Sequence, residues 1–157
     1  MQEAEGLSAT DAKRRQWFLQ ERLGLFVHWG CYSVHVQGEQ AMWRERIPEA
    51  DYRKFADRFK PASDFAQRWA QWARAQGLRY VVLTTRHHDG YCLFDTGHDD
   101  FNAVNTGPGR DLIAEFVEAT RAAGLRVGLY YSIVNWRFRG QWDAEAYPED
   151  IPRMIDQ

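Results

Sequence analysis

Histidine follows an apolar run at two places in this chain. Leu25–Val27 leads directly into His28, and Tyr80–Thr85 is followed closely by His87 and His88. Apolar runs of this length, with helical pattern between them, are typical of parallel strands that are covered by helices. Ligands bind beyond the carboxyl ends of such strands. We therefore expect the three imidazoles to meet in one pocket, where they can donate and accept hydrogen bonds.

Asp89 follows the two adjacent histidines, and a carboxylate beside imidazoles is also typical of metal ligands. Among the three histidines His28, His87 and His88, however, the usual ligand spacing of two or four residues is absent, and only His87 and Asp89 are two residues apart. A metal-dependent hydrolase is therefore a minor alternative, and we expect no metal and no cofactor. The histidines also have a purely structural interpretation, as polar residues that are hydrogen-bonded at strand ends.

The hydrophobic pattern predicts the elements that position these residues. Apolar runs alternate with two segments of helical spacing, each of which ends at a glycine that can cap it. Alternation within the third strand places Tyr130 on the face expected to line a barrel interior. The expected strands are about Leu25–Val27, Leu78–Thr85 and Leu125–Ser132, and the expected helices lie between Asp64 and Gly77 and over Arg110–Ala123.

Segments outside this alternation have simpler interpretations. The amino-terminal pattern predicts a helix that ends at about Arg22, with Trp17 and Phe18 on its buried side. Residues 31–46 read as a long loop, and loops of that length inside compact domains usually have a function. Pro48 is well placed to begin a short helix, because the backbone N–H that proline lacks has no partner in the first turn of a helix.

Composition and charge exclude several classes of function. The 157 residues suffice to bury a core, so we expect one domain over residues 1–157. The 20 basic and 22 acidic residues are mixed along the chain, which argues against nucleic acid as a partner. No run reaches the roughly eighteen apolar residues of a membrane span, and no secretory signal is visible. We therefore expect a cytoplasmic protein without membrane partners, with Cys31 and Cys92 as reduced thiols.

Five short motifs occur in a fixed order. They are Phe26-Val27-His28-Trp29-Gly30, Thr84-Thr85-Arg86-His87-His88-Asp89-Gly90, Asp100-Phe101-Asn102, Arg110-Asp111-Leu112 and Gly128-Leu129-Tyr130-Tyr131-Ser132. Together these motifs resemble the α-L-fucosidases of glycoside hydrolase family 29. The resemblance covers roughly Trp17 to Tyr147, and it is specific because several separate motifs agree at once.

The resemblance implies a fold, an activity and a set of site residues. The family has a (β/α)8 catalytic barrel followed by a β-sandwich, and it hydrolyses terminal α-L-fucose with retention of configuration. This chain is similar to the first third of the barrel, so the expected fold is α/β, a partial TIM-type barrel of about three βα units. The implied substrate is a fucosylated glycan or fucoside. The implied fucose-binding residues are His28, Glu39, His87, His88 and Tyr130.

Two positions depart from the family pattern. The family's usual Glu-Trp pair reads Glu39-Gln40 here, so the role of the indole falls to Trp43, or Gln40 binds directly. The Asp-Trp pair that commonly follows the third strand reads Asn135-Trp136. Neither change excludes sugar binding.

The family's catalytic carboxylates lie beyond the part of the barrel that this chain resembles. A retaining glycosidase needs two carboxyl groups about 5 Å apart. Glu39 is a weak candidate for the acid, with a solvated loop carboxylate as its simpler interpretation, and no residue is assigned as the nucleophile. The acids that oligomerisation would have to bring into the pocket are Asp95, Asp99, Asp143 and Asp150.

Three parallel strands leave two open edges and an uncovered apolar face. We therefore expect a homo-oligomer that completes or covers the partial barrel, unless a second polypeptide supplies the rest. The leading hypothesis is an α-L-fucosidase-type glycoside hydrolase. The alternative is a non-catalytic fucose-binding module or an inactive truncated fucosidase, because a missing nucleophile removes turnover.

Overall fold

A small parallel sheet forms the frame of the chain. The computed structural model describes residues 9–138, 140 and 145–155. Within these ranges the sheet has the strand order β1-β2-β3, with neighbouring strands parallel. Leu25, Val81 and Val127 occupy the same level of the three strands. The strands are β1 (Gly24–Val27), β2 (Tyr80–Arg86) and β3 (Arg126–Tyr131).

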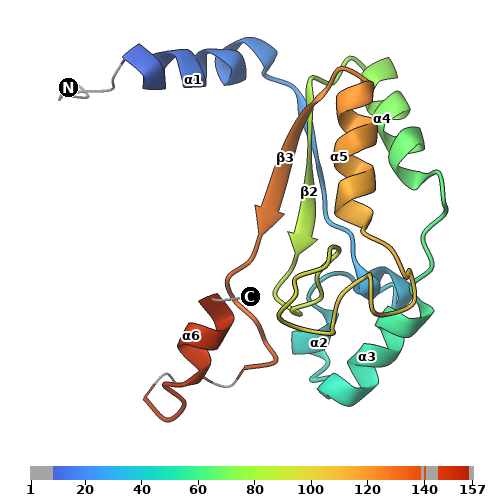
Figure 1. Cartoon of the computed structure of the whole chain (residues 1–157), viewed down its shortest axis with the longest axis vertical. Helices are drawn as coiled ribbons and strands as arrows, with labels where there is room; N and C mark the ends of the chain where they lie inside the picture. Colours follow the sequence, from blue (N-terminus) through green and yellow to red (C-terminus); the bar gives the residue numbers. More distant parts are fainter. Residues whose placement is uncertain (1–8, 139, 141–144, 156–157) are drawn as a thin grey trace.

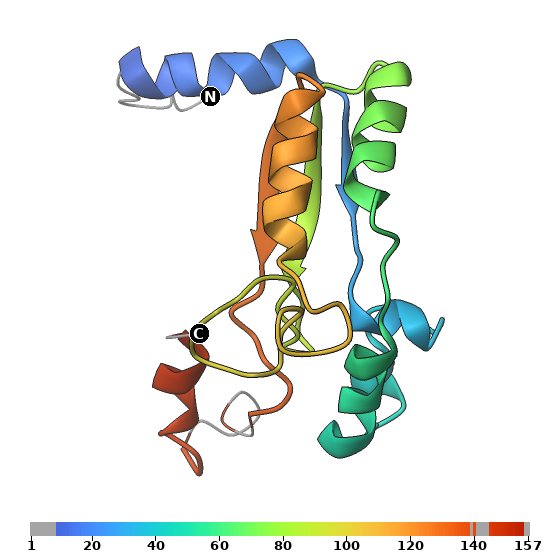
Figure 2. The same cartoon turned by 45° about the vertical axis from the view of Figure 1, so that its right-hand side comes forward.

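Two helices cover one face of this sheet, as Figures 1 and 2 show. They are α4 (Phe65–Ala75), which connects β1 to β2, and α5 (Leu112–Ala122), which connects β2 to β3. Leu83 of β2 and Phe116 of α5 belong to the core between these layers and are almost completely buried. The helices therefore fix the sheet from one side, and the other side is left to line a site.

The remaining helices lie at the two ends of the sheet (Figure 1). The carboxyl ends of all three strands point toward the end at which three short helical segments and the long loops gather. This is the end at which parallel α/β sheets bind ligands. The segments there are η1 (Cys31–Val34), α2 (Ala41–Arg44) and α3 (Glu49–Arg58), while α1 (Ala9–Glu21) lies at the opposite end and α6 (Asp150–Ile155) near the carboxyl terminus.

The predicted alternation of strands and helices is confirmed, and the bounds of the strands and of α5 differ from the expected ones by no more than two residues. Two expectations were wrong. Residues 31–46 were expected to be an irregular loop but contain η1 and α2. Phe18 was expected to be buried but is 53% exposed, because α1 meets the sheet through Trp17, which packs edge-on against Tyr80.

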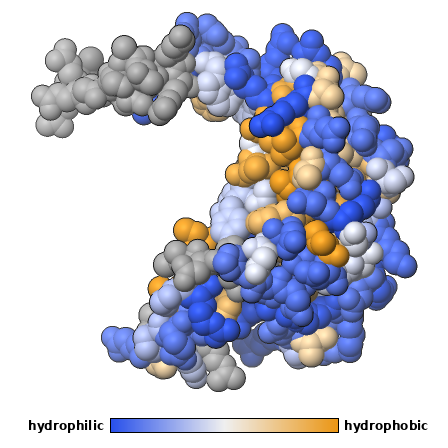
Figure 3. Space-filling model, viewed as in Figure 1, coloured by the Kyte–Doolittle hydropathy of each residue, from blue (hydrophilic) through white to orange (hydrophobic). Residues whose placement is uncertain are grey.

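The face opposite α4 and α5 is open to solvent. Phe26 on this face is 50% exposed, and Figure 3 shows that this side of the molecule is hollowed. The sheet edges are β1 and β3, and Leu129 on β3 is 52% exposed. The architecture is that of a partial (β/α)8 barrel, in which further strands would continue the sheet. No helix in the described ranges is long and apolar enough to cross a lipid bilayer.

A tight turn follows β2 and carries two of the predicted site histidines. Gly90 in this turn has a φ of 80°, in the left-handed region that favours glycine. Its backbone N–H donates to the carbonyl of His87 at 3.1 Å. A Cβ atom on Gly90 would lie 2.5 Å from Oδ1 of the buried Asn135 side chain. The turn therefore packs so closely against the segment after β3 that no larger residue fits.

We predict that Gly90→Ala lowers the free energy of unfolding by about 2–4 kcal/mol, because backbone strain and the clash with Asn135 add. The matched control is Gly77→Ala. Gly77 has a φ of 77°, but a Cβ atom there would meet no atom within 4 Å, so only the backbone cost of about 1 kcal/mol is expected. Urea denaturation of both variants measures the difference, and equal losses would contradict the close packing of the turn.

Candidate functional site

The imidazoles of His28, His87 and His88 meet at the carboxyl ends of β1 and β2. The ring centroids of His28 and His87 are 5.6 Å apart, and those of His87 and His88 are 4.3 Å apart. Tyr130 of β3 joins this group, with its ring 6.2 Å from His28 and 6.3 Å from His87. The predicted meeting of the three histidines is thus confirmed, and each strand contributes at least one member.

Two threonines of β2 hold the neighbouring strands in place beside these rings. The Thr84 hydroxyl lies 3.1 Å from both the backbone nitrogen and the carbonyl oxygen of Trp29, the residue after His28. The next residue, Thr85, donates its hydroxyl proton to the carbonyl of Tyr130 at 2.8 Å. Both threonines are buried, so these contacts are shielded from water. They fix the spacing between the strand ends that carry His28, His87 and Tyr130.

His87 and His88 lie on the same side, although side chains of adjacent residues in a straight strand would point to opposite sides. The two rings lie together because β2 ends at Arg86 and the chain turns at the histidines. Trp136, in the segment after β3, contacts both rings, at 6.1 Å from His87 and 5.2 Å from His88. Its backbone N–H also donates to the carbonyl of His88 at 2.7 Å. The two imidazoles therefore lie side by side, with His88 partly exposed and His87 5% exposed.

The tautomer of His88 follows from its partner. Ser132 donates its hydroxyl proton to the carbonyl of Val134 at 3.1 Å. The same hydroxyl lies 2.5 Å from Nδ1 of His88, so its oxygen must accept a hydrogen bond from the N–H at Nδ1. With the proton on Nδ1, the neutral ring keeps Nε2 as a hydrogen-bond acceptor. His88 can thus accept a hydrogen bond from a hydroxyl group of a ligand.

His87 is held in its neutral form. Burial lowers its pKa to about 4, and the nearby charges of His88 and His28 act in the same direction, while Glu39 opposes them. Its Nδ1 is buried and has no hydrogen-bond partner within the described part of the chain, so protonation would leave a buried donor unsatisfied. The pKa of His88 is also lowered by burial. His87 and His88 are therefore neutral imidazoles rather than cations at neutral pH.

A buried carboxylate organises the segments that carry these histidines. Asp89 is 1% exposed and accepts a hydrogen bond from the Tyr52 hydroxyl of α3 at 2.8 Å. The same oxygen lies 3.7 Å from the Cys31 thiol of η1, and the other oxygen accepts a hydrogen bond from the backbone N–H of Tyr91 at 3.1 Å. Asp89 thus connects the turn after His87 to α3 and to the segment after His28.

Burial has the largest effect on the pKa of the Asp89 carboxyl. It raises the pKa of Asp89, and the hydrogen bonds from Tyr52, Tyr91 and Cys31 together with the charge of Arg86 lower it in part. Burial beside Asp89 also raises the pKa of the Cys31 thiol well above its usual range. Cys31 is therefore an unreactive, protonated thiol at neutral pH, and it is not bonded to Cys92.

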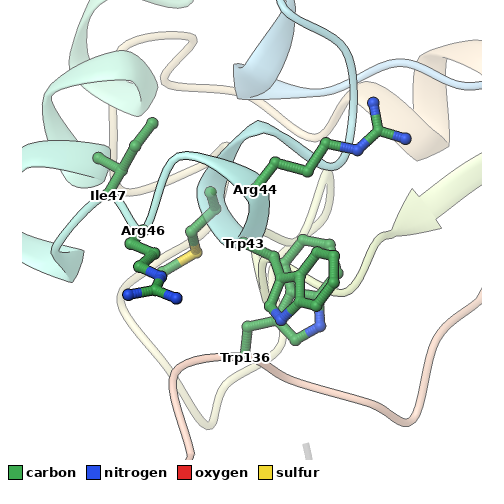
Figure 4. A pocket seen from close by; sticks show the side chains of 6 residues that line it. Trp43, Arg44, Arg46, Ile47 and Trp136 are labelled. Atoms are coloured by element: carbon green, nitrogen blue, oxygen red, sulfur yellow. The ribbon is translucent and has the colours of Figure 1, made fainter.

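Of the other predicted site residues, Glu39 lies between η1 and α2, and Trp43 lies in α2. Glu39 is partly exposed and close enough to raise the pKa of His87 and His88 electrostatically. Gln40 is the N-cap residue of α2, which begins at Ala41. Trp43 is 52% exposed and, with Trp136, lines an open pocket of about 480 Å³ beside the histidines (Figure 4). The indole of Trp43 therefore borders the site through Trp136.

The candidate acids form hydrogen bonds or ion pairs away from the histidine group. Asp99 forms a short ion pair with Arg137, and this pair lowers the pKa of Asp99 although burial alone would raise it. Asp95 accepts a backbone N–H within its own turn, and Asp150 accepts the N–H of Gly140 at 2.9 Å. Asp143 lies outside the described residues. The three described acids thus have structural partners outside the histidine group.

No group of three or more His, Cys, Asp and Glu side chains in the described ranges is arranged to hold a metal ion. The buried Asp89 faces Tyr52 and Cys31 instead of pointing into the histidine group. The arrangement therefore offers hydrogen bonds and aromatic surface.

Several positioning residues were missed by the sequence analysis. Thr84 and Thr85 read as ordinary strand residues, and Ser132 as the end of a strand, because a β-branched or small polar residue in a strand carries no signal of its partner. By its spacing, Tyr52 falls on the apolar face of its helix. A polar group such as the tyrosine hydroxyl on such a face requires a buried acceptor, and this was the available signal.

Comparison with known proteins agrees with this geometry. The family described as Alpha-L-fucosidase matches residues 2–154 of the chain. The plasma α-L-fucosidase of Rattus norvegicus is 36% identical over 138 residues, which are 76% of this chain and 30% of that protein. The human plasma α-L-fucosidase is also 36% identical, over 140 residues. The chain thus spans about a third of the length of these curated relatives.

Solved structures give the same result. α-L-Fucosidase isoenzyme 1 from Paenibacillus thiaminolyticus superposes with a TM-score of 0.84 at 42% identity, over 92% of this chain and 38% of that one. The α-L-fucosidase AlfC from Lactobacillus casei, in complex with its α-L-fucose product, superposes with a TM-score of 0.73 at 35% identity, over 78% of this chain and 41% of that one. On sequence and on fold, this chain belongs to the α-L-fucosidase family.

Proposed function

We propose that this chain supplies the fucose-binding part of an α-L-fucosidase-type glycoside hydrolase. The observation that carries the proposal is the convergence of His28, His87, His88 and Tyr130 at the carboxyl ends of three parallel strands. The Lactobacillus casei relative contains α-L-fucose as its product, which supports the same ligand here. The substrate class is a fucosylated glycan or fucoside.

The chemistry of the site suits this sugar. Fucose is uncharged and presents hydroxyl groups and a methyl group, so it requires fixed donors and acceptors beside an apolar wall. The neutral imidazoles and Tyr130 supply the polar groups. Phe26 stacks on His28 with ring centroids 5.0 Å apart and is half exposed on the open face, so it provides apolar surface for the methyl side.

Hydrolysis with retention needs a second set of groups. Two carboxyl groups about 5 Å apart must flank the glycosidic bond. Glu39 lies near the histidines, whereas Asp89 is buried and occupied by Tyr52 and Tyr91. The nucleophile of the proposed hydrolase therefore comes from outside the described residues. Until it is supplied, the chain acts as a fucose-binding module, the alternative function that this distribution of carboxylates favours.

Self-association is the second part of the proposal. The backbone groups along the outer edges of β1 and β3 have no strand partner among the described residues. Leu129, Ile133 and Val134 on and after β3 are exposed by 52%, 60% and 43%. Open edges and exposed apolar side chains favour association. We propose that a second copy of the chain covers this surface.

The binding proposal predicts that L-fucose shifts the imidazole proton resonances of His28, His87 and His88, whereas its mirror image D-fucose does not. His87→Ala should lower the affinity for L-fucose by roughly tenfold or more, because a hydrogen-bond partner and a wall of the site are removed. His98→Ala, at an exposed loop position, is the control and should bind as the unmodified protein does. NMR titration measures both. Equal shifts with the two enantiomers would contradict the proposal.

The lowered pKa of His87 predicts a dependence of stability on pH. Its pKa is about 4 in the folded protein against 6.5 in an unfolded chain, so between these values only the unfolded chain binds the proton. The free energy of unfolding should therefore rise with pH between about 4 and 6.5 and show no further contribution from His87 above that window. In His87→Gln this part of the slope should vanish. Urea denaturation at several pH values tests the point, and an unchanged slope would exclude His87 as its source.

Self-association predicts a sedimentation coefficient that increases with protein concentration in the micromolar range. Leu129→Lys on the edge strand should shift the equilibrium toward the monomer, because a charge on an edge opposes pairing. Leu19→Lys, on α1 at the opposite end of the sheet and likewise exposed, is the control. A monomer at every concentration would contradict the proposed contact.

A further inference from the structure

The pocket between Trp43 and Trp136 is built by the end of α2. The N–H of Ile47 donates to the carbonyl of Met42 at 3.0 Å, and the N–H of Arg46 to that of Trp43 at 3.2 Å. These two bonds are the pattern of a Schellman motif, in which a residue in the left-handed conformation ends a helix. That residue is Arg46, with a φ of 53°. Glycine usually fills this position, so Arg46 holds its conformation at some cost in backbone strain.

The pocket that results has an apolar base and a basic rim. Met42 and Ile47, the pair that accompanies the motif, form apolar walls together with the two indoles. Figure 4 shows Arg44 and Arg46 extending on opposite sides of the two indoles. Both arginines are exposed, and neither guanidinium group forms a hydrogen bond or an ion pair with another residue in the described ranges. No acidic side chain is among the residues that line the pocket.

The pocket adjoins the histidine group. Trp136 is a wall of both, since its ring lies 5.2 Å from that of His88. A glycan that places fucose among the histidines would therefore place the neighbouring sugar against the two indoles. Flat aromatic faces suit sugar rings, and a volume of about 480 Å³ is ample for one ring.

We propose that this pocket binds the sugar next to fucose and prefers one that carries an anionic group, either a sulfate ester or a carboxylate. Two unpaired guanidinium groups beside an apolar, acid-free pocket favour an anion, because each can form charge-assisted hydrogen bonds to its oxygens. The inference rests on the proposed function, because it takes the position of fucose as given. It adds a class of substrate, namely acidic fucosylated glycans.

The test compares four ligands by calorimetry on the full chain. They are L-fucose, a neutral fucosyl disaccharide, and the same disaccharide with a sulfate or with a carboxylate on the second sugar. We expect at least one anionic disaccharide to bind about tenfold more tightly than the neutral one, with a preference that declines as salt is added. The two anionic compounds distinguish the sulfate from the carboxylate.

Variants assign this preference to the pocket. Arg46→Gly should abolish most of the preference while leaving the midpoint of thermal unfolding unchanged or raised, because glycine suits the left-handed position. Arg44→Gln should reduce the preference, and Arg74→Gln, an exposed arginine on α4, should leave it intact. Binding of L-fucose alone should be the same in all three variants.

The failures of the two proposals can be told apart. If L-fucose binds but the neutral and anionic disaccharides bind equally, or if Arg46→Gly keeps the full preference, the basic pocket is not a subsite and the proposed function stands. If L-fucose does not bind at all, the proposed function and this inference both fall.

Discussion

The hydrogen bonds of the buried Asp89 carboxylate are the interaction on which the site depends. One carboxylate connects Tyr52 of α3, Tyr91 of the loop after β2 and Cys31 of η1. A buried charge is tolerated only where such partners compensate its loss of water, so the three segments cannot separate without leaving it unsatisfied. His28 lies three residues before Cys31 and His87 two before Asp89, and their rings are therefore held at a fixed distance.

This arrangement separates support from recognition. The groups that hold the site together are buried at the sheet ends, whereas Phe26, which stacks on His28, is half exposed on the open face. The lowered pKa of His87 has the same origin, because a buried imidazole with an unsatisfied Nδ1 stays neutral. A neutral, fixed set of donors and acceptors is what an uncharged sugar requires.

The sequence predicted the strands and the meeting of the histidines because both depend on local pattern. Apolar runs with glycine-capped helices between them define the βα alternation, and parallel strands bring their carboxyl ends together whatever the side chains are. The turn at His87 and His88 could not be predicted in this way. It depends on Gly90 packing against Asn135, a contact between residues that are far apart in the chain. The short helices in residues 31–46 were missed because they are only one turn long, and the hydrogen bond of Tyr52 because its helix face reads as apolar.

The affinity of Tyr52→Phe for L-fucose tests the central claim most directly. Tyr52 is fully buried beneath the site, so the substitution removes only the hydrogen bond to Asp89. Tyr91→Phe is the matched control, because that buried hydroxyl pairs with Thr106 instead. If Asp89 sets the positions of the histidines, Tyr52→Phe weakens L-fucose binding in fully folded protein and Tyr91→Phe does not. Lower stability of Tyr52→Phe with undiminished affinity would show that the carboxylate serves folding alone.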